Sequence, residues 1–216
     1  MGDARVVTIS ASYGAGGSLI APRLATALGL EFADRLLTPD VAEGAEDEAQ
    51  AVGESEREEG RWTRFLDRLA IVTGGMTLAP VTTDDIRRPL RETVEASVGK
   101  LACEGAVILG RAGCLVLADR PGVFHVRLDG PPDRRLRRGM AIEQIDAATA
   151  KRHLEETDRA RDRYVDRLYG RRTSDPALYH LVLDATVLSV DDAVVLLRQA
   201  AEAFWARELK AVAAQS

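Results

Sequence analysis

The sequence predicts an α/β protein with a three-layer α/β/α fold and a mostly parallel sheet. Short aliphatic runs, typical of buried strands, recur at residues 6–10, 106–109, 123–128 and 181–183. Segments with apolar residues at helical spacing separate these runs, and strands that alternate with helices favour this class. The chain has 216 residues, and a chain of this size buries roughly 70% of its unfolded surface, enough for one substantial core.

The N-terminal part predicts a strand, a glycine-rich loop and a helix, in that order. Val6–Ser10 is β-branched and apolar, as expected of a strand buried on both faces. The loop Ser12–Ser18 follows, and Leu19–Leu28 then shows helical spacing until Gly29, which favours the end of a helix. Residues 30–33 suit a second short strand.

The remaining helices are predicted from capping residues and apolar spacing. Thr83 favours the start of a helix that runs to about Cys103, and Pro131-Pro132 opens one near residues 134–139. Residues 142–168 predict a single long helix, and residues 190–209 predict the last one. Between these elements, residues 43–59 carry eight acids and one base, a composition typical of solvated helices or a mobile segment.

Charge and composition limit the classes of partner. The net charge is −5 and the pI is about 5.4, so we expect no nucleic acid polymer as partner. The chain lacks a run of about 18 apolar residues, so we expect no membrane span. Its two cysteines fit a reducing, cytoplasmic location. The oligomeric state stays open.

The glycine-rich loop is the strongest candidate for a binding site. A loop between a strand and a helix presents backbone N–H groups at the helix N-terminus, where anions bind. The strict P-loop pattern G-x-x-x-x-G-K-[ST] is not met, because Ala11 replaces its first glycine and Gly17 replaces its lysine. The alternative is a glycine-rich turn without a ligand.

Two further features lie in positions that suit a phosphate. Residues 134–172 hold eleven arginines and one lysine against seven acids, which predicts either an arginine lid over phosphates or a helix with surface ion pairs. Gly110-Arg111 ends a buried strand, at the sheet edge where ligands of α/β proteins bind. The alternative for Arg111 is an ion pair with a local acid.

Several stretches together resemble the cytidylate kinase-like family. Residues 7–21 are similar to its opening strand and glycine loop, and residues 107–112 to its central strand with a Gly-Arg pair. Residues 123–128 and 157–164 resemble its fourth strand and lid helix, and residues 179–184 its last strand. The likeness spans nearly the whole chain, with residues 43–60 the least similar part.

The resemblance implies a P-loop NTPase-like nucleoside monophosphate kinase in a single domain over residues 1–216. The expected parts are a core (1–34, 84–140 and 170–216), a monophosphate-binding insert (35–83) and a helical lid (141–169). The implied reaction is phosphoryl transfer from ATP, with Mg²⁺, to CMP or dCMP. Because the lysine is missing, two alternatives remain: a weak or inactive nucleotide-binding regulatory protein, and a kinase for another small phosphoacceptor.

The resemblance also implies a role for individual residues. The ATP phosphates would lie against Gly14, Ala15, Gly16, Gly17 and Ser18, with the Ser18 hydroxyl as the Mg²⁺ ligand. The acceptor nucleotide would contact Asp34 and Arg111. The catalytic lid residues at the transferring phosphate would be Asp158, Arg159, Arg161 and Arg163.

Overall fold

The computed structural model describes residues 5–33 and 83–213. The chain divides into two compact units, one of residues 1–35 with 98–216 and one of residues 36–97. Of the predicted insert, only Thr83 is described, and it begins helix α4 (Thr83–Glu104). Asp34 lies outside the described residues. The site discussed below belongs entirely to the first unit.

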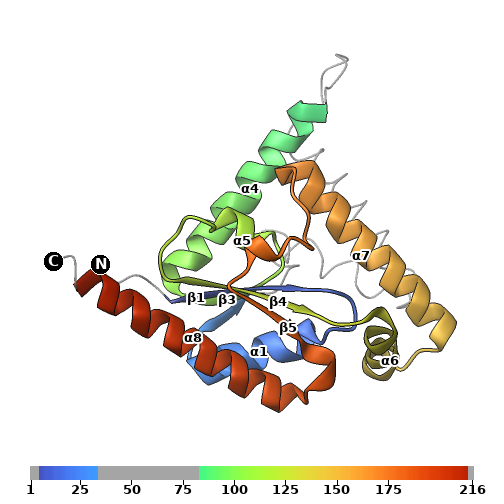
Figure 1. Cartoon of the computed structure of the whole chain (residues 1–216). Helices are drawn as coiled ribbons and strands as arrows, with labels where there is room; N and C mark the ends of the chain where they lie inside the picture. Colours follow the sequence, from blue (N-terminus) through green and yellow to red (C-terminus); the bar gives the residue numbers. More distant parts are fainter. Residues whose placement is uncertain (1–4, 34–82, 214–216) are drawn as a thin grey trace, which may run out of the picture. The chain divides into compact units, whose positions relative to one another are not determined.

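Five parallel strands form the sheet of the first unit. They are β1 (Val6–Ala11), β2 (Glu31–Ala33), β3 (Ala106–Leu109), β4 (Val123–Asp129) and β5 (Leu181–Asp184). Their order across the sheet is β2-β3-β1-β4-β5, with every pair parallel (Figure 1). The α/β class predicted from the aliphatic runs is therefore confirmed.

Helices cover both faces of this sheet and make three layers. On one face α1 (Gly17–Leu28) packs with α8 (Val190–Ala213), and on the other lie α5 (Gly113–Val116) and the last turns of α4 (Figure 1). Each large apolar side chain that becomes fully buried contributes about 1.5–3 kcal/mol. The core between the sheet and the α1/α8 layer includes Val7, Ile9, Ile20, Leu24, Leu109, Val126, Leu197 and Trp205.

The helices predicted near residues 134–139 and over residues 142–168 are both present, but the boundary between them lies a few residues later than predicted. Helix α6 (Pro132–Glu143) ends at Gln144, whose left-handed φ of 56° breaks the helical path. Helix α7 (Ala147–Tyr169) then starts afresh, with the Asp146 carboxylate accepting a hydrogen bond from the Thr149 N–H at 2.8 Å. An N-cap of this kind satisfies an otherwise unpaired donor of the first turn. Helix α5, only four residues long, was not predicted.

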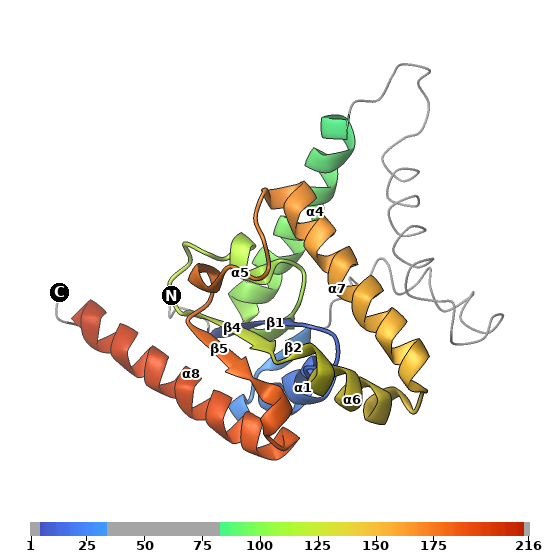
Figure 2. The same cartoon turned by 45° about the vertical axis from the view of Figure 1, so that its right-hand side comes forward.

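Because of the strand order, the glycine loop follows the central strand of the sheet. β1 lies between β3 and β4, and the chain crosses from one side of β1 to the other when it passes from β3 to β4. Ligands of open α/β sheets bind outside the carboxyl ends of the strands at such a switch point. The loop after β1 contacts α6 and α7 at this switch point (Figure 2).

No described helix combines the length with the apolar character that crossing a membrane requires.

Candidate functional site

The glycine loop joins β1 to α1 and depends on two left-handed residues. Gly14 has φ +70° and Gly16 has φ +83°, a region that glycine enters without strain. A Cβ atom at Gly14 would lie 2.0 Å from the backbone oxygen of Arg135, so the loop passes directly against α6. Gly16 caps α1 without a side-chain hydrogen bond, and the Leu19 N–H donates to the Gly16 carbonyl at 3.1 Å, so the N–H groups of Gly17 and Ser18 are those that suit another acceptor.

Ala11 and Gly17, the two residues that depart from the P-loop pattern, lie against each other in the structure. A Cβ atom at Gly17 would lie only 2.5 Å from the Cβ of Ala11. The methyl group of Ala11 therefore fills the space that a side chain at residue 17 would enter. Alanine at the first position and glycine at the lysine position are thus a matched pair, and a lysine does not fit beside Ala11 in this backbone.

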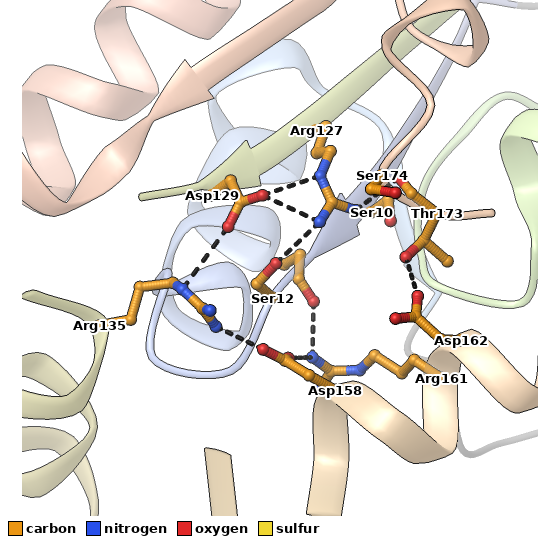
Figure 3. A pocket seen from close by; sticks show the side chains of 11 residues that line it. Ser10, Ser12, Arg127, Asp129, Arg135, Asp158, Arg161, Asp162, Thr173 and Ser174 are labelled. Carbon is orange, nitrogen blue, oxygen red and sulfur yellow. Dashed lines mark hydrogen bonds and ion pairs between the residues drawn. The ribbon is translucent and has the colours of Figure 1, made fainter. Parts of the chain in front are cut away.

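A small pocket of about 100 Å³ opens beside the loop, at the carboxyl ends of β1 and β4 (Figure 3). Besides Ala11, it is lined by hydroxyl groups and by equal numbers of acids and bases. The hydroxyl groups belong to Ser10, Ser12, Thr173 and Ser174, and the charged side chains are Arg127, Asp129, Arg135, Asp158, Arg161 and Asp162. Because every base is an arginine, the pocket presents planar, fixed groups of donors that suit phosphate.

Arg127, which lies near the end of β4, lines the pocket. Its guanidinium is buried and donates to the Asp129 carboxylate at 2.9 and 3.0 Å. It also donates to the Ser12 hydroxyl at 3.0 Å and to the Thr173 carbonyl at 2.8 Å. Burial opposes the charge of Arg127, but the Asp129 carboxylate and Tyr179 together outweigh this effect and the pKa of Arg127 is raised. Arg127 stays charged and holds the strand end, the loop and residue 173 together.

Arg135 ties the glycine loop to α6. Its Nε donates to the Gly130 carbonyl at 2.9 Å, and its Nη1 donates to the Tyr13 carbonyl at 3.1 Å. The same Nη1 donates to the Asp158 carboxylate at 2.6 Å. Since the side chain is 9% exposed, the guanidinium holds one fixed position beside the loop.

Helix α7 brings Asp158 and Arg161, two of the predicted lid residues, to the loop. The Tyr13 N–H donates to Asp158 Oδ1 at 2.9 Å, and Arg161 Nη1 donates to the Ala11 carbonyl at 2.6 Å. Residues three or four apart share a helix face, so Asp158, Arg161 and Asp162 all line the pocket. The carboxylate of Asp162 accepts a hydrogen bond from Thr173 rather than from the loop (Figure 3).

The other predicted lid arginines lie elsewhere. Arg159 and Arg163 are exposed and do not line this pocket, and Arg163 Nε donates to the Arg159 carbonyl at 3.4 Å. Arg111 follows β3 with a left-handed φ of 54° and does not line the pocket either. Burial raises the pKa of Tyr164 on α7, and the positive charge of Arg111 acts against that rise. Arg111 therefore lies close enough to α7 to act on Tyr164.

Three arginines of the site were not among the predicted site residues. Arg127 and Arg135 are described above, and Arg138 lies on α6 with its Nη2 2.8 Å from where a Gly16 Cβ would be. Arg138 also donates to the Ala185 carbonyl, and burial lowers its pKa. Two signals were present in the sequence: a charged residue within a buried strand, and arginines three residues apart on one helix.

Magnesium has no protein cage among the described residues. No group of three or more His, Cys, Asp or Glu side chains is arranged there to hold a metal ion. Ser18 is exposed in the first turn of α1, where its hydroxyl is accessible as a single ligand. Magnesium usually binds nucleotide enzymes through few protein groups together with substrate phosphates. The residues present therefore fit Mg²⁺ that arrives with a nucleotide.

A parallel sheet whose central strand leads through a glycine loop into a helix defines an α/β protein of the P-loop NTPase type. The chain belongs to the cytidylate kinase-like family, which it matches over residues 6–187. The family predicted from the sequence is thereby confirmed, and with it a relationship to kinases. None of the curated proteins matches the chain.

Solved structures also resemble the chain. An uncharacterized protein from Eubacterium ventriosum ATCC 27560 has a TM-score of 0.63 and 18% identity, over 92% of this chain and 98% of that one. This likeness supports the fold. A shikimate kinase from Bacteroides thetaiotaomicron has a TM-score of 0.48 and 12% identity, over 92% and 98%. A gluconokinase from Sinorhizobium meliloti 1021 has a TM-score of 0.47 and 16% identity, over 99% and 98%.

Proposed function

We propose that the protein transfers a phosphoryl group from ATP to a nucleoside monophosphate, with CMP or dCMP as the preferred acceptor. One observation carries this proposal: the glycine loop and arginines from β4, α6 and α7 converge at the carboxyl end of β1. Phosphoryl transfer needs positioning and charge stabilisation more than covalent chemistry from the protein. The preference for a cytidine nucleotide rests on the family to which the chain belongs.

The loop would hold the phosphates of ATP. Gly14 and Gly16 allow a phosphate to approach the backbone closely, and the first-turn N–H groups of α1 face an anion favourably. Ser18 would be the protein ligand of the Mg²⁺ that accompanies ATP. The ion itself would supply further neutralisation of phosphate charge.

Arginine would replace the missing P-loop lysine. Arg161 already contacts the Ala11 carbonyl at the start of the loop, and the Arg138 guanidinium lies beside Gly16. A guanidinium that stabilises charge in the transition state is worth about 3 kcal/mol or more. In this proposal Arg161, with Arg138, supplies the positive charge that the lysine supplies in the strict pattern. Asp158 stays as a predicted catalytic residue, and Asp34 and Arg111 as predicted acceptor contacts. Arg159 and Arg163, predicted from the family resemblance to act at the phosphate, are exposed and outside the pocket, so the proposal gives them no catalytic role.

A coupled assay for ADP tests the proposal, with MgATP and each nucleoside monophosphate in turn. We expect ADP release to depend on the acceptor, with CMP or dCMP fastest. Turnover only with a non-nucleotide acceptor would make the protein a kinase for another small molecule. Tight MgATP binding in calorimetry without turnover would make it a nucleotide-binding regulatory protein, and either result would overturn the proposed activity.

A further inference from the structure

The carboxylate of Asp158 lies where the glycine loop would receive an anion. Its Oδ1 accepts a hydrogen bond from the Tyr13 N–H at 2.9 Å, and its Oδ2 accepts one from Arg135 Nη1 at 2.6 Å. Tyr13 belongs to the loop and Arg135 to the helix packed against it. A backbone N–H paired with a guanidinium is also the donor set that binds a phosphate oxygen.

The charges of the pocket are already satisfied within the protein. Three arginines and three aspartates line it, so its formal charge is zero. Arg127 pairs with Asp129 at 2.9 Å, and Arg135 pairs with Asp158 at 2.6 Å. Arg161 lies 3.7 Å from Asp158 as well. An incoming polyphosphate therefore meets no unneutralised excess of positive charge at the described pocket.

We propose that Asp158 is an internal competitor of phosphate, which occupies two donors beside the glycine loop until an anion displaces it. This inference rests on the proposed function and deepens it, because it assigns Tyr13 N–H and Arg135 as phosphate donors. A phosphate and the Asp158 carboxylate need the same two donors, so they exclude each other. Binding is therefore coupled to release of the Asp158 carboxylate from the loop.

The break between α6 and α7 makes this release local. The left-handed Gln144 and the Asp146 cap separate α7 from α6, so Asp158 and Arg135 lie on different helices. Loss of the Asp158 contact therefore breaks one link between α7 and the loop, while Arg161 keeps its bond to the Ala11 carbonyl and Arg135 keeps its bonds to the Gly130 and Tyr13 carbonyls. Arg135 stays in place to receive the phosphate.

The test compares Asp158→Asn with Asp162→Asn by calorimetry, using inorganic pyrophosphate as the probe. Both variants remove one negative charge from the same helix and the same pocket, but only Asp158 contacts the loop. Asparagine keeps the size of the side chain and an oxygen for the Tyr13 N–H. We expect Asp158→Asn to bind pyrophosphate at least about tenfold more tightly than the native protein, since a charged hydrogen-bond partner no longer competes. Asp162→Asn should stay within about twofold.

A second measurement follows the Tyr13 amide by ¹⁵N–¹H NMR in the native protein. Pyrophosphate should shift this amide, and Asp158→Asn alone should shift it without ligand. Equal or weaker pyrophosphate affinity in Asp158→Asn, equal gains in both variants, or no binding to any of them would overturn the inference.

The same proteins separate this inference from the proposed function. If Asp158→Asn tightens pyrophosphate binding and no acceptor gives ADP, the inference stands and the kinase proposal fails. If the assay gives nucleotide-dependent ADP and Asp158→Asn gains no affinity, the kinase proposal stands and Asp158 is no competitor. Thermal unfolding of each variant shows that the compared proteins are folded.

Discussion

Ala11 and Gly17 share one small space: a Cβ atom at residue 17 would lie 2.5 Å from the Cβ of Ala11. We predict that Gly17→Ala lowers the free energy of unfolding by about 1–3 kcal/mol, the usual cost of overpacking. A loss of stability would be informative, because replacing glycine by alanine within a helix otherwise raises the free energy of unfolding. Urea unfolding of the single variants and of Ala11→Gly/Gly17→Ala measures the coupling, which should be at least about 1 kcal/mol in favour of the double variant. Additive losses would contradict it.

Gly14 and Gly29 offer a matched comparison for the role of the loop. Both have a left-handed φ, +70° and +65°, so the conformational part of the cost of alanine, about 1–2 kcal/mol, is the same at each. A Cβ at Gly29 meets nothing within 4 Å, whereas a Cβ at Gly14 would overlap the Arg135 carbonyl. We therefore expect Gly14→Ala to abolish MgATP binding in calorimetry and Gly29→Ala to retain it. Native-like binding by Gly14→Ala would show that the loop is not the phosphate site.

The orientation of α7 determines which of its arginines contacts the glycine loop. Arg161 contacts the Ala11 carbonyl, whereas Arg159 is exposed and outside the pocket. Given kinase activity, we predict that Arg161→Ala lowers kcat/KM about 10²–10³-fold, the usual loss for one group that stabilises transition-state charge. Arg159→Ala should change kcat/KM by less than about threefold. Equal losses in both variants would mean that both arginines reach the substrate when nucleotide is bound.

A buried histidine should make the fold sensitive to acid. His125 Nδ1 lies 2.7 Å from the Thr8 hydroxyl, and the residue is 4% exposed. Burial, assisted by the charge of His180, lowers the pKa of His125 to about 4. Its pKa in the unfolded chain is about 6.5, so the unfolded state takes up the proton first. Stability is complete above pH 6.5 and falls as the pH drops toward 4.

The measurement is urea unfolding at pH 7.5 and at pH 5. We expect a loss of about 2 kcal/mol between these values from His125, and burial lowers the pKa of His180 in the same direction. Unchanged stability across this range would show that His125 is protonated without cost.

The sheet was predictable because parallel strands buried on both faces appear as uninterrupted aliphatic runs, such as residues 106–109. The exact boundary between α6 and α7 was not, since apolar spacing continues across Gln144 and the Asp146 cap is the local signal there. The four residues of α5 are too few to show a helical period. Local patterns therefore predicted the layers but not every helix boundary.

The candidate site was predictable only in part. The glycine loop follows from its sequence, but which arginine of α7 faces it depends on how that helix packs, with Val165 and Leu168 buried. Arg127 reaches the loop because β1 and β4 pair with Ser10 opposite it, a register that the sequence does not specify. Arg135 reaches it because the loop lies against α6 at Gly14. Such contacts join residues more than a hundred positions apart.

The cations that line the pocket are all arginine, and this decides which reagents can label it. The three lysines of the chain, Lys100, Lys151 and Lys210, do not line the described pocket. An ATP analogue that acylates amines would find no ε-amino group there, whereas a dicarbonyl reagent selective for guanidinium groups would find Arg161. A guanidinium also keeps its proton well above pH 10, where a lysine loses it. A survey of nucleotide-binding proteins by lysine labelling would therefore miss this one.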